Sequence, residues 1–376
     1  MINGMVGMVL KRGYYVHFEG RKIIGVSKKI DMQLEELRKT FYVEEIQVAS
    51  VRRNLIKRIL GLFPTASIKR EYENALSQIE KPDFIYIRRT VADHDYIKFL
   101  GKIKEKYPSC KVLLEVFTYP YDRDDFGKWN AWPFYFKEKI YRSQLKKYVD
   151  RIVTYTDDKE IFEIPTICTV NGIHVEEIRM VGGQYREDVI TLIGVAFMQK
   201  HHGYERLIRG LREYYRGKKE KRVELLLIGE GPEKASYQRL VRKYKLQNHV
   251  KFYSTKSGKE LDAMYDMSDV ALASFGMYKL GIYSKLSALK TRECLAKGMP
   301  IITGCSIDVL DENYKYVKNF SNDAQIIDIE EIIAFFENIR KHAANKDMVA
   351  QEIREFATEH VSMKSAMKAI VEYIEG

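Results

Sequence analysis

Short apolar runs alternate with longer amphipathic stretches along almost the whole chain. In the first half, the apolar runs predict strands at residues 14–18, 45–49, 83–88, 111–116, 151–155 and 167–170. Helical periodicity lies between them, near residues 27–39, 67–79, 93–106 and 134–149. Strands that alternate with helices are typical of a parallel sheet with helices on both faces.

The second half repeats this alternation. Its predicted strands are residues 189–195, 223–228, 250–253, 270–273 and 301–303. Its predicted helices lie near residues 204–215, 233–245, 258–267 and 286–297. The chain after about residue 330 is helical and charged, with no strand pattern. We therefore expect an α/β protein with two doubly wound, Rossmann-like domains.

A boundary between these domains is predicted at residues 180–188. This polar stretch, MVGGQYRED, contains glycine and follows the turn-forming pair Asn171-Gly172. Ligands of doubly wound sheets bind beyond the carboxyl ends of the strands. Two such domains that face each other across a cleft form a binding site from these ends.

Composition narrows the class of protein. The 376 residues are 45% hydrophobic and 31% charged, which is ordinary for a soluble globular protein with two cores. No apolar run is long enough to span a membrane, and the first residues lack a signal-peptide layout, so we expect a cytoplasmic protein. The four cysteines, Cys110, Cys168, Cys294 and Cys305, are scattered in or beside apolar stretches, which favours buried thiols over a metal site or disulfides.

The charge balance points to anionic partners. Lys+Arg number 63 and Asp+Glu 52, so the net charge is +11. Such a surface attracts nucleic acid, anionic lipids or phosphorylated substrates. No nucleic-acid-binding motif is evident, so no nucleic-acid partner is expected. Residues 51–63, VRRNLIKRILGLF, combine helical apolar spacing with four basic residues. This pattern fits a helix on an anionic membrane surface, and equally a core-packing helix with a solvated basic face.

Candidate chemistry lies in the loops after the predicted strands of the second domain. The loop GVAFMQKHHG, residues 194–203, contains Lys200, His201 and His202 just before a predicted helix. A cation at a helix N-terminus suits a diphosphate, although a solvated basic turn has the same pattern. Residues 229–232, GEGP, allow a tight turn; the full GxGxxG fingerprint is absent because residue 234 is lysine.

The loop and helix at residues 273–302 carry the densest set of candidates. Lys290 and Glu293 are three residues apart and share a helix face. The ammonium suits a phosphate and the carboxylate suits ribose hydroxyls, while an ordinary surface ion pair explains the same spacing. In the first domain, residues 115–122, EVFTYPYD, follow a predicted strand, and their carboxylates and aromatic rings suit sugar recognition, or a loop of packed tyrosines. His94, after the strand at 83–88, is a lesser candidate.

Taken together and in order, these elements resemble the retaining glycosyltransferases of family 4, which have the GT-B fold. The resemblance runs over most of the chain. The elements that carry it are Asn171-Gly172-Ile173, residues 194–203, 229–232, 250–254 and 268–270, Lys290-Thr291-Arg292-Glu293, and residues 296–300. The sequence departs from the family pattern at His174, at Val195, and at Lys285, where the first of two glutamates is expected.

The resemblance implies roles for individual residues. Lys200, Lys290 and Glu293 are expected to act in catalysis, Glu293 as the ribose-binding glutamate. Donor contacts are expected from Gly194, His202, Gly203, Gly229, Ser254, Lys279 and Lys285. Acceptor contacts are expected from Gly25, Lys28, His94, Glu115, Tyr119, Tyr121 and Asp122. The implied domains are residues 1–180 for the acceptor and 181–355 for the nucleotide-sugar donor, with a helix at 356–376 that packs back on the first domain.

The predicted activity is transfer of a sugar from a nucleotide-diphosphate sugar to a glycan or lipid-linked acceptor, with retention, in bacterial polysaccharide biosynthesis. No metal or other cofactor is expected. Two alternatives share the fold: a non-catalytic nucleotide-sugar-binding subunit and a sugar-nucleotide epimerase. Residues 51–63 predict peripheral contact with an anionic membrane, at the inner face of the cell membrane.

Overall fold

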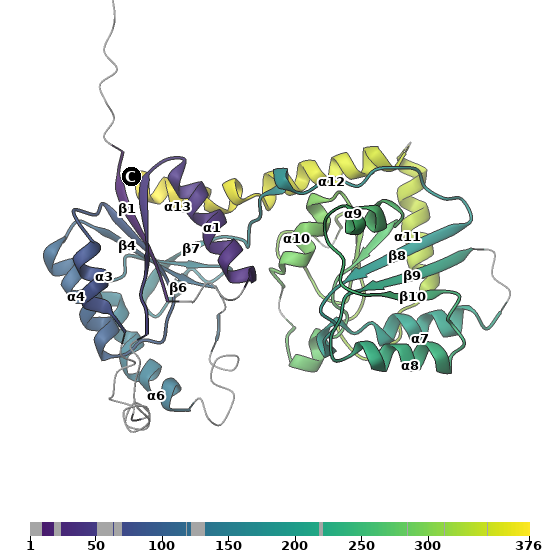
Figure 1. The fold of residues 1–376 in the computed structure, drawn as a ribbon, viewed down its shortest axis with the longest axis horizontal. Coiled ribbons are helices and arrows are strands. Elements are labelled where there is room, and N and C mark those ends of the chain that lie inside the picture. Colours follow the sequence, from purple (N-terminus) through teal and green to yellow (C-terminus); the bar gives the residue numbers. More distant parts are fainter. Residues whose placement is uncertain are drawn as a thin grey trace, which may run out of the picture. The chain divides into compact units, whose positions relative to one another are not determined.

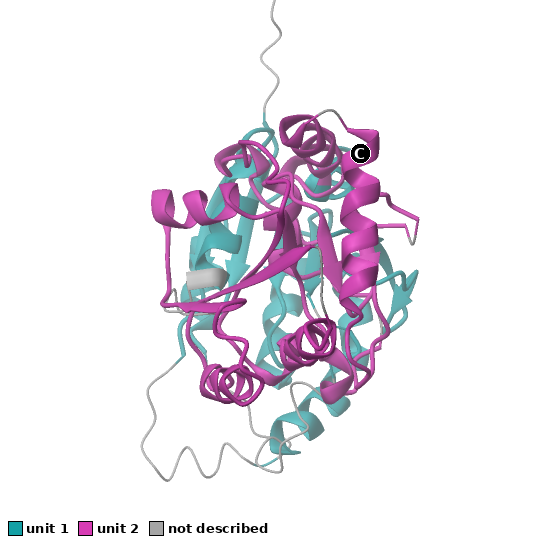
Figure 2. Cartoon of the chain, turned by 90° about the vertical axis from the view of Figure 1, so that its right-hand side faces the viewer, with its two compact units in different colours: residues 1–170, 366–376 teal, residues 171–365 magenta. Residues whose placement is uncertain are grey.

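The computed structural model contains two compact units, formed by residues 1–170 with 366–376 and by residues 171–365 (Figures 1 and 2). The structure describes residues 10–18, 24–50, 63, 70–117, 119–121, 132–217, 221–283, 285–311, 313–343 and 345–376. The division between the units falls at the Asn171-Gly172 turn, about ten residues before the predicted boundary.

The first unit is built around a sheet of seven strands in the order β2-β1-β3-β4-β5-β7-β6, parallel except for the pair β6 and β7. The strands are β1 (Arg12–His17), β2 (Tyr42–Gln47), β3 (Phe84–Arg88), β4 (Lys111–Val116), β5 (Arg151–Thr154), β6 (Glu160–Ile161) and β7 (Ile164–Cys168). The helices are α1 (Ile24–Arg38), α3 (Tyr72–Gln78), α4 (His94–Lys106), α6 (Trp132–Tyr141) and the 3-10 helix η2 (Arg142–Lys147).

The second unit contains a parallel sheet of six strands in the order β10-β9-β8-β11-β12-β13. These are β8 (Val189–Val195), β9 (Arg222–Ile228), β10 (Val250–Tyr253), β11 (Val270–Leu272), β12 (Ile301–Thr303) and β13 (Val317–Asn319). Its longer helices are α7 (Glu205–Tyr214), α8 (Lys234–Lys243), α9 (Gly258–Asp266), α10 (Leu289–Ala296), α11 (Ile329–His342) and α12 (Lys346–His360). The 3-10 turns are η3 (Val175–Glu177), η4 (Lys200–His202) and η5 (Met277–Leu280).

The second sheet is buried on both faces, which explains the apolar runs of its strands. Along β8, Leu192 packs in a cluster with α7, α8 and α11, while the next residue, Ile193, packs in a cluster with α10 and α12. Strands that are covered on both sides need apolar residues at successive positions. Every strand predicted from the sequence is present, and four have the predicted bounds: β4, β8, β10 and β12.

Two strands were not predicted. β6 has two residues and β13 has three, and each lies at the edge of its sheet. Such short edge strands carry too few residues for a periodic pattern. The mixed α/β class with two Rossmann-like parallel sheets is confirmed. The predicted cleft between the domains stays a prediction.

The last helix, α13 (Met363–Glu375), ends in the first unit, to which residues 366–376 belong. The Nζ atoms of Lys11 and Lys111 donate hydrogen bonds to main-chain oxygens of its last turn, at 2.7 Å from Ile374 and Tyr373 respectively. Lysines near the free carbonyls of a helix C-terminus satisfy acceptors that lack an intrahelical partner. These contacts attach the end of the chain to β1 and β4.

Candidate functional site

The loops that follow β8 and β11 are joined through their main chains. The amide of Phe275 donates to the oxygen of His202 at 2.9 Å, and that of Gly276 to the oxygen of His201 at 3.0 Å. Gly203 has a φ of 62°, and a Cβ there would lie 2.6 Å from the carbonyl carbon of Phe275. Glycine is therefore required at 203 for both its conformation and this close approach.

A cavity of about 180 Å³ is lined by these two loops, by the start of α10 and by the loop after β12. Its lining includes His201, His202, Ser274, Lys290, Thr291 and Cys305. Residues from three loops meet here because β8, β11 and β12 are adjacent and parallel, so their carboxyl ends share one edge. The structure thus brings the predicted residues Lys290, His202 and Gly203 together.

Lys290 is a half-buried cation at this cavity. Its Nζ donates a hydrogen bond of 2.8 Å to the hydroxyl of Tyr204, which is fully buried. This acceptor is neutral, so the contact does not cancel the ammonium charge. Burial lowers the pKa of Lys290 to about 8. The nearby Cys294 and Glu293 have the opposite, smaller effect, because they favour the charged form.

The two histidines of η4 are neutral donors at physiological pH. Burial and the nearby Lys290 charge lower the pKa of His201 below its ordinary value, and the same two causes lower that of His202 to about 3. The Nδ1 of His202 accepts from the amide of Gln199 at 3.0 Å, which assigns its ring proton to Nε2. A cation with neutral N–H donors beside it suits an anion.

Three further predicted charges, Glu293, Lys285 and Lys200, have exposed side chains. Glu293 lies on α10, one turn from Lys290, and the other two lie in the loop before α10 and at the start of η4. Of these, the exposed side chains of Lys285 and Lys200 have several rotamers available. Lys279, on η5, instead forms an ion pair with Glu205 on α7, so this carboxylate neutralises part of its charge.

The glycines of the predicted donor set act through packing. A Cβ on Gly194 would lie 3.1 Å from the hydroxyl of Tyr204. Gly229 has a φ of 124°, and a Cβ there would lie 2.1 Å from the main-chain oxygen of Ala196. Both glycines therefore position the loop after β8. Ser254 is exposed and directly follows β10.

Buried arginines that the sequence analysis did not single out hold this edge together. Arg292 donates to the main-chain oxygen of Asn171 at 3.3 Å and to the hydroxyl of Ser287 at 3.0 Å, and it forms an ion pair with Asp308. Arg206 donates to the main-chain oxygens of Phe275 at 2.8 Å and of Ser321 at 2.9 Å. No local pattern distinguishes these arginines from surface ones, because their partners are distant in sequence.

The predicted acceptor residues of the first unit do not form one exposed set. Gly25 and Lys28 lie within α1 instead of in the predicted loop, because the helix already begins at Ile24; Lys28 is exposed. His94, expected after a strand, is the first residue of α4, where it is exposed beside Asp95 with an Nδ1–Oδ1 distance of 3.2 Å. Asp122 lies outside the described residues, as do residues 51–62 of the predicted membrane-binding segment.

Glu115 is fully buried at the end of β4, although the sequence placed it in an accessible loop. It pairs with Arg88 at 2.8 Å and accepts hydrogen bonds from Tyr155 at 2.5 Å and Gln33 at 2.9 Å. Burial alone would raise the pKa of this carboxyl, but Arg88, Lys29 and the hydrogen bonds lower it below its ordinary value. Its observed contacts are those of a structural carboxylate.

The two predicted tyrosines differ in exposure. Tyr121 is buried and its hydroxyl donates to Glu138 at 2.5 Å. Tyr119 is half-buried, with its ring centroid 6.3 Å from that of Tyr121. Of the four cysteines, Cys168 is exposed, which corrects the expectation of a buried thiol, while the other three are buried. Cys168 pairs with Thr154 of β5 on one side, but β6 on the other side pairs only with Ile164 and Pro165 and does not reach Cys168.

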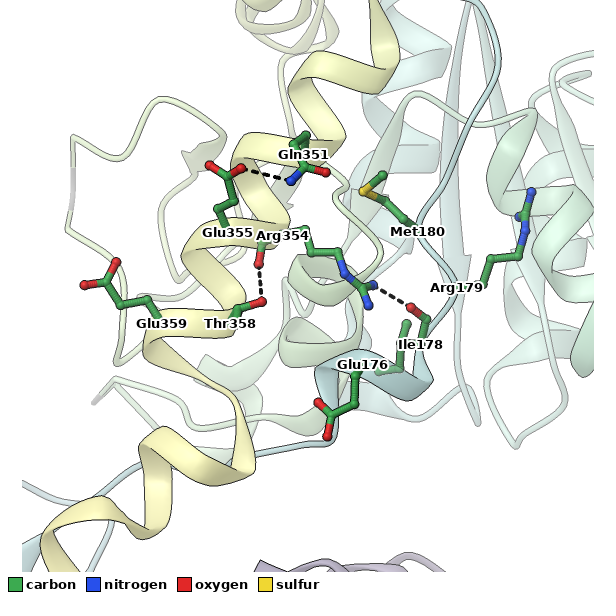
Figure 3. A pocket seen from close by; sticks show the side chains of 9 residues that line it. All are labelled: Glu176, Ile178, Arg179, Met180, Gln351, Arg354, Glu355, Thr358 and Glu359. Atoms are coloured by element: carbon green, nitrogen blue, oxygen red, sulfur yellow. Dashed lines mark hydrogen bonds between the residues drawn. The ribbon is translucent and has the colours of Figure 1, made fainter.

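A larger hollow of about 620 Å³ lies between η3 and α12 (Figure 3). Arg354 crosses it and donates to the main-chain oxygens of Val175 at 2.7 Å and Ala296 at 2.6 Å. Figure 3 also shows Gln351 bonded to Glu355 at 2.9 Å. This hollow shares no lining residue with the smaller cavity. Several of its polar groups, those of Gln351, Arg354 and Thr358, bond within its own wall, so the smaller cavity is the better candidate.

Two other kinds of site are not found in the described residues. Within the described ranges, no group of three or more His, Cys, Asp or Glu side chains is placed to hold a metal ion. None of the helices in the described part of the chain is long and apolar enough to cross a membrane.

Residues 175–345 match the family described as glycosyl transferases group 1, and this match covers most of the second unit. No curated protein sequence matches the chain. The matched region contains η4, α10 and the cavity between them.

Solved glycosyltransferases are similar over the whole chain. A glycosyltransferase from Rickettsia africae ESF-5 is 12% identical with a TM-score of 0.61, over 97% of this chain and 98% of its own. HepE from Anabaena, in complex with UDP, is 11% identical with a TM-score of 0.61, over 97% and 99%. The lipopolysaccharide outer core galactosyltransferase WaaB is 12% identical with a TM-score of 0.58, over 96% and 99%. The shared fold is GT-B, and with the family match it supports a glycosyltransferase.

Proposed function

We propose that this protein is a retaining glycosyltransferase that moves a sugar from a nucleotide-diphosphate sugar to a glycan or lipid-linked acceptor. The observation that carries the proposal is the cation Lys290, held by Tyr204 beside the neutral donors His201 and His202. An ammonium whose hydrogen-bond acceptor is a neutral hydroxyl, with N–H donors beside it at the carboxyl edge of a parallel sheet, suits a diphosphate.

In this mechanism the cavity stabilises the leaving group. The bond between the anomeric carbon and the diphosphate oxygen breaks, and negative charge grows on that oxygen. Lys290, at the start of α10, and Lys200 and the Nε2–H of His202, on η4, can offer positive charge and a hydrogen bond to it. The family resemblance implies attack from the same face of the sugar, with the leaving phosphate accepting the proton of the acceptor hydroxyl.

The donor class and the biological role are inferred from similar proteins. HepE from Anabaena was solved with UDP and with UDP-glucose, which supports a nucleoside diphosphate as the carrier here. WaaB is a lipopolysaccharide outer core galactosyltransferase, which supports a role in bacterial polysaccharide biosynthesis. Glu293, exposed on α10, is proposed to bind the donor ribose. The protein is proposed to need no metal or other cofactor.

Thermal unfolding with UDP, GDP or ADP tests the donor site, because a ligand that binds only the folded state raises its stability. We expect one nucleotide to raise the unfolding temperature. The variants Glu293→Ala and Lys290→Met should lose most of this increase. Lys315→Met, which removes an exposed lysine paired with Glu352, is the matched control and should keep it.

Incubation with labelled nucleotide sugars and a membrane extract then tests the activity. Transfer to an acceptor, or slow hydrolysis, supports the glycosyltransferase. Binding with neither product would identify the non-catalytic nucleotide-sugar-binding subunit. Epimerisation of the nucleotide sugar without an acceptor would identify the epimerase.

A further inference from the structure

Helix α6 of the first unit buries charged side chains and exposes apolar ones. Its buried residues are Pro133 and the charged pair Lys137 and Glu138. Its large apolar residues Trp132, Phe136 and Ile140 are exposed, by 50%, 49% and 44% respectively. A helix on the surface of a soluble protein normally turns its apolar stripe toward the core. The exposed stripe of α6 therefore needs an explanation.

The rotation of α6 is set by its buried charges. One carboxylate oxygen of Glu138 accepts from the amide of Ala92 at 2.6 Å, and the other accepts from the hydroxyl of Tyr121 at 2.5 Å. Lys137 donates to the main-chain oxygen of Phe63. Turning the helix to hide its apolar stripe would break these bonds and leave buried polar groups unpaired, which is costly. The stripe is thus held outward by the protein's own hydrogen bonds.

The exposed apolar residues of the helix form one surface, which we call the α6 face: Trp132, Phe136 and Ile140. The three helical residues are four positions apart, so they lie along one side of α6. The rings of Trp132 and Phe136 are 5.9 Å apart. Phe63 is 60% exposed and is tied to α6 through Lys137. Helix α6 is labelled in Figure 1, near the lower end of the first unit.

Basic residues dominate the chain from α6 to η2. From residue 132 to 147 the chain has five Lys and Arg residues and a single carboxylate, Glu138, which is buried. Lys139, Lys146 and Lys147 are exposed, and Lys146 has Glu163 as a partner at 2.6 Å. In the sequence, residues 51–62, which directly precede Phe63, contain four basic residues and no acidic one.

We propose that the α6 face docks the protein on a membrane surface with anionic lipid headgroups. Trp132 and Phe136 would enter the boundary between headgroups and acyl chains, where aromatic side chains are favoured. The lysines beside them would meet the lipid phosphates, each adding attraction that salt weakens. A second copy of the chain fits less well, because both copies carry +11. Nucleic acid would leave the stripe of Trp132, Phe136 and Ile140 in water.

Vesicle binding by the full chain tests the proposal. Wild type should sediment with vesicles of phosphatidylcholine that contain phosphatidylglycerol, and much less with phosphatidylcholine alone. The triple variant Trp132→Ala, Phe136→Ala, Ile140→Ala should bind the anionic vesicles at least about tenfold more weakly. The matched control, Tyr42→Ala, Met267→Ala, Met348→Ala, removes three equally exposed apolar side chains elsewhere and should bind as wild type does. Equal binding by the two triple variants would overturn the proposal.

Fluorescence gives a second readout that does not depend on loss of binding. The chain has two tryptophans, so Trp129→Phe leaves Trp132 as the only one. Its emission should move to shorter wavelength with anionic vesicles and be quenched by lipids brominated in the acyl chain. Unchanged emission would contradict insertion of Trp132. A wild-type dimer that the α6 triple variant converts to monomer would instead assign the face to a second copy. The proposal does not depend on the glycosyltransferase activity, so neither result bears on that function.

Discussion

The ammonium of Lys290 and the hydroxyl of Tyr204 lie 2.8 Å apart, although 86 residues separate them in the chain. Tyr204 lies just before α7, and Lys290 is the second residue of α10. The tyrosine ring is fully buried, so its hydroxyl is a fixed acceptor. Tyr204 therefore orients the cation at the cavity, and it is a positioning residue for the proposed donor site.

Removal of this hydroxyl should weaken donor binding without unfolding the protein. In Tyr204→Phe the ammonium loses its acceptor, a loss of about 1–2 kcal/mol, so the affinity for the preferred nucleotide should fall by about fivefold to thirtyfold. Calorimetric titration measures this. Tyr214→Phe makes the same change on α7, where the hydroxyl donates to the main-chain oxygen of Lys221 at 2.8 Å, and should bind the nucleotide normally. Equal affinities in the two variants would exclude a positioning role for Tyr204.

Nucleotide affinity should depend on pH through Lys290. Its pKa of about 8 means that the ammonium is present below pH 8 and is lost above it. Because a diphosphate binds the charged form, affinity should fall above this pH, by up to roughly tenfold per pH unit. Titrations between about pH 6.5 and 9.5 measure the profile. Lys290→Met should bind weakly with no such fall, and a flat wild-type profile would contradict the assignment.

The lowered pKa of Lys290 affects the stability of the fold in the opposite direction: stability should rise with pH, whereas nucleotide affinity should fall. The folded pKa lies below the ordinary value of 10.5, so between about pH 8 and 10.5 the unfolded chain binds more protons than the folded one. Lys290 should therefore destabilise the fold most below pH 8, and this cost should shrink as the pH rises. Unfolding of the free protein by urea, wild type against Lys290→Met, measures the difference. It should be largest at neutral pH.

Gly229→Ala should disturb the edge of the second sheet. The new Cβ would lie 2.1 Å from the oxygen of Ala196, at a φ of 124°. Backbone strain and a shift of the loop after β8 should together lower the free energy of unfolding by more than about 2 kcal/mol. Gly258→Ala is the control, because its φ is 53° but nothing lies within 4 Å of the new Cβ. It should cost about 1 kcal/mol, as measured by urea unfolding.

Arg292→Met should destabilise the second unit strongly. It leaves Asp308 without its partner and removes donors from Asn171 and Ser287, so we expect a loss of about 3–5 kcal/mol. Arg179→Met, which breaks the exposed pair with Asp266 at 2.9 Å, should cost less than about 1 kcal/mol. The unfolding midpoint of each variant checks the contrast. Similar midpoints would show that Arg292 does not anchor the start of α10.

Glu115→Gln should destabilise the first unit, because it leaves the buried Arg88 without a charged partner. The expected loss is about 3–5 kcal/mol at neutral pH. Since the folded pKa of Glu115 is below its ordinary value, its contribution is present above that ordinary value and is lost as the pH falls through the folded pKa. Glu163→Gln, at the exposed pair with Lys146, is the control and should be nearly neutral. Loss of acceptor affinity with unchanged stability would instead favour the predicted acceptor role.

Features that depend on residues close together in the sequence were predicted, and features that depend on residues far apart were not. Strand β8 was predicted with its observed bounds because its apolar run reflects local burial on both faces. Gly203 was predicted from the resemblance of residues 194–203 to the family's phosphate loop, which is a local motif, and its φ of 62° is one that glycine favours. Glu115 was placed in an accessible loop because a carboxylate at a strand end usually meets solvent. Its burial depends on Arg88, Tyr155 and Gln33, which come from three other parts of the chain.

The sequence by itself determined the alternation of strands and helices, the two Rossmann-like sheets and the loops at their carboxyl ends. It did so because periodic burial, turn formation and helix ends depend on residues a few positions apart. Only the tertiary structure decided that Tyr204 holds Lys290, that Glu115 is buried, and that α6 turns its apolar residues outward. Each of these results from partners far apart in sequence, whose distances are set when the sheets and helices pack. The three cases have one physical reason in common: the charge state and the burial of a residue depend on the environment that the folded chain builds around it.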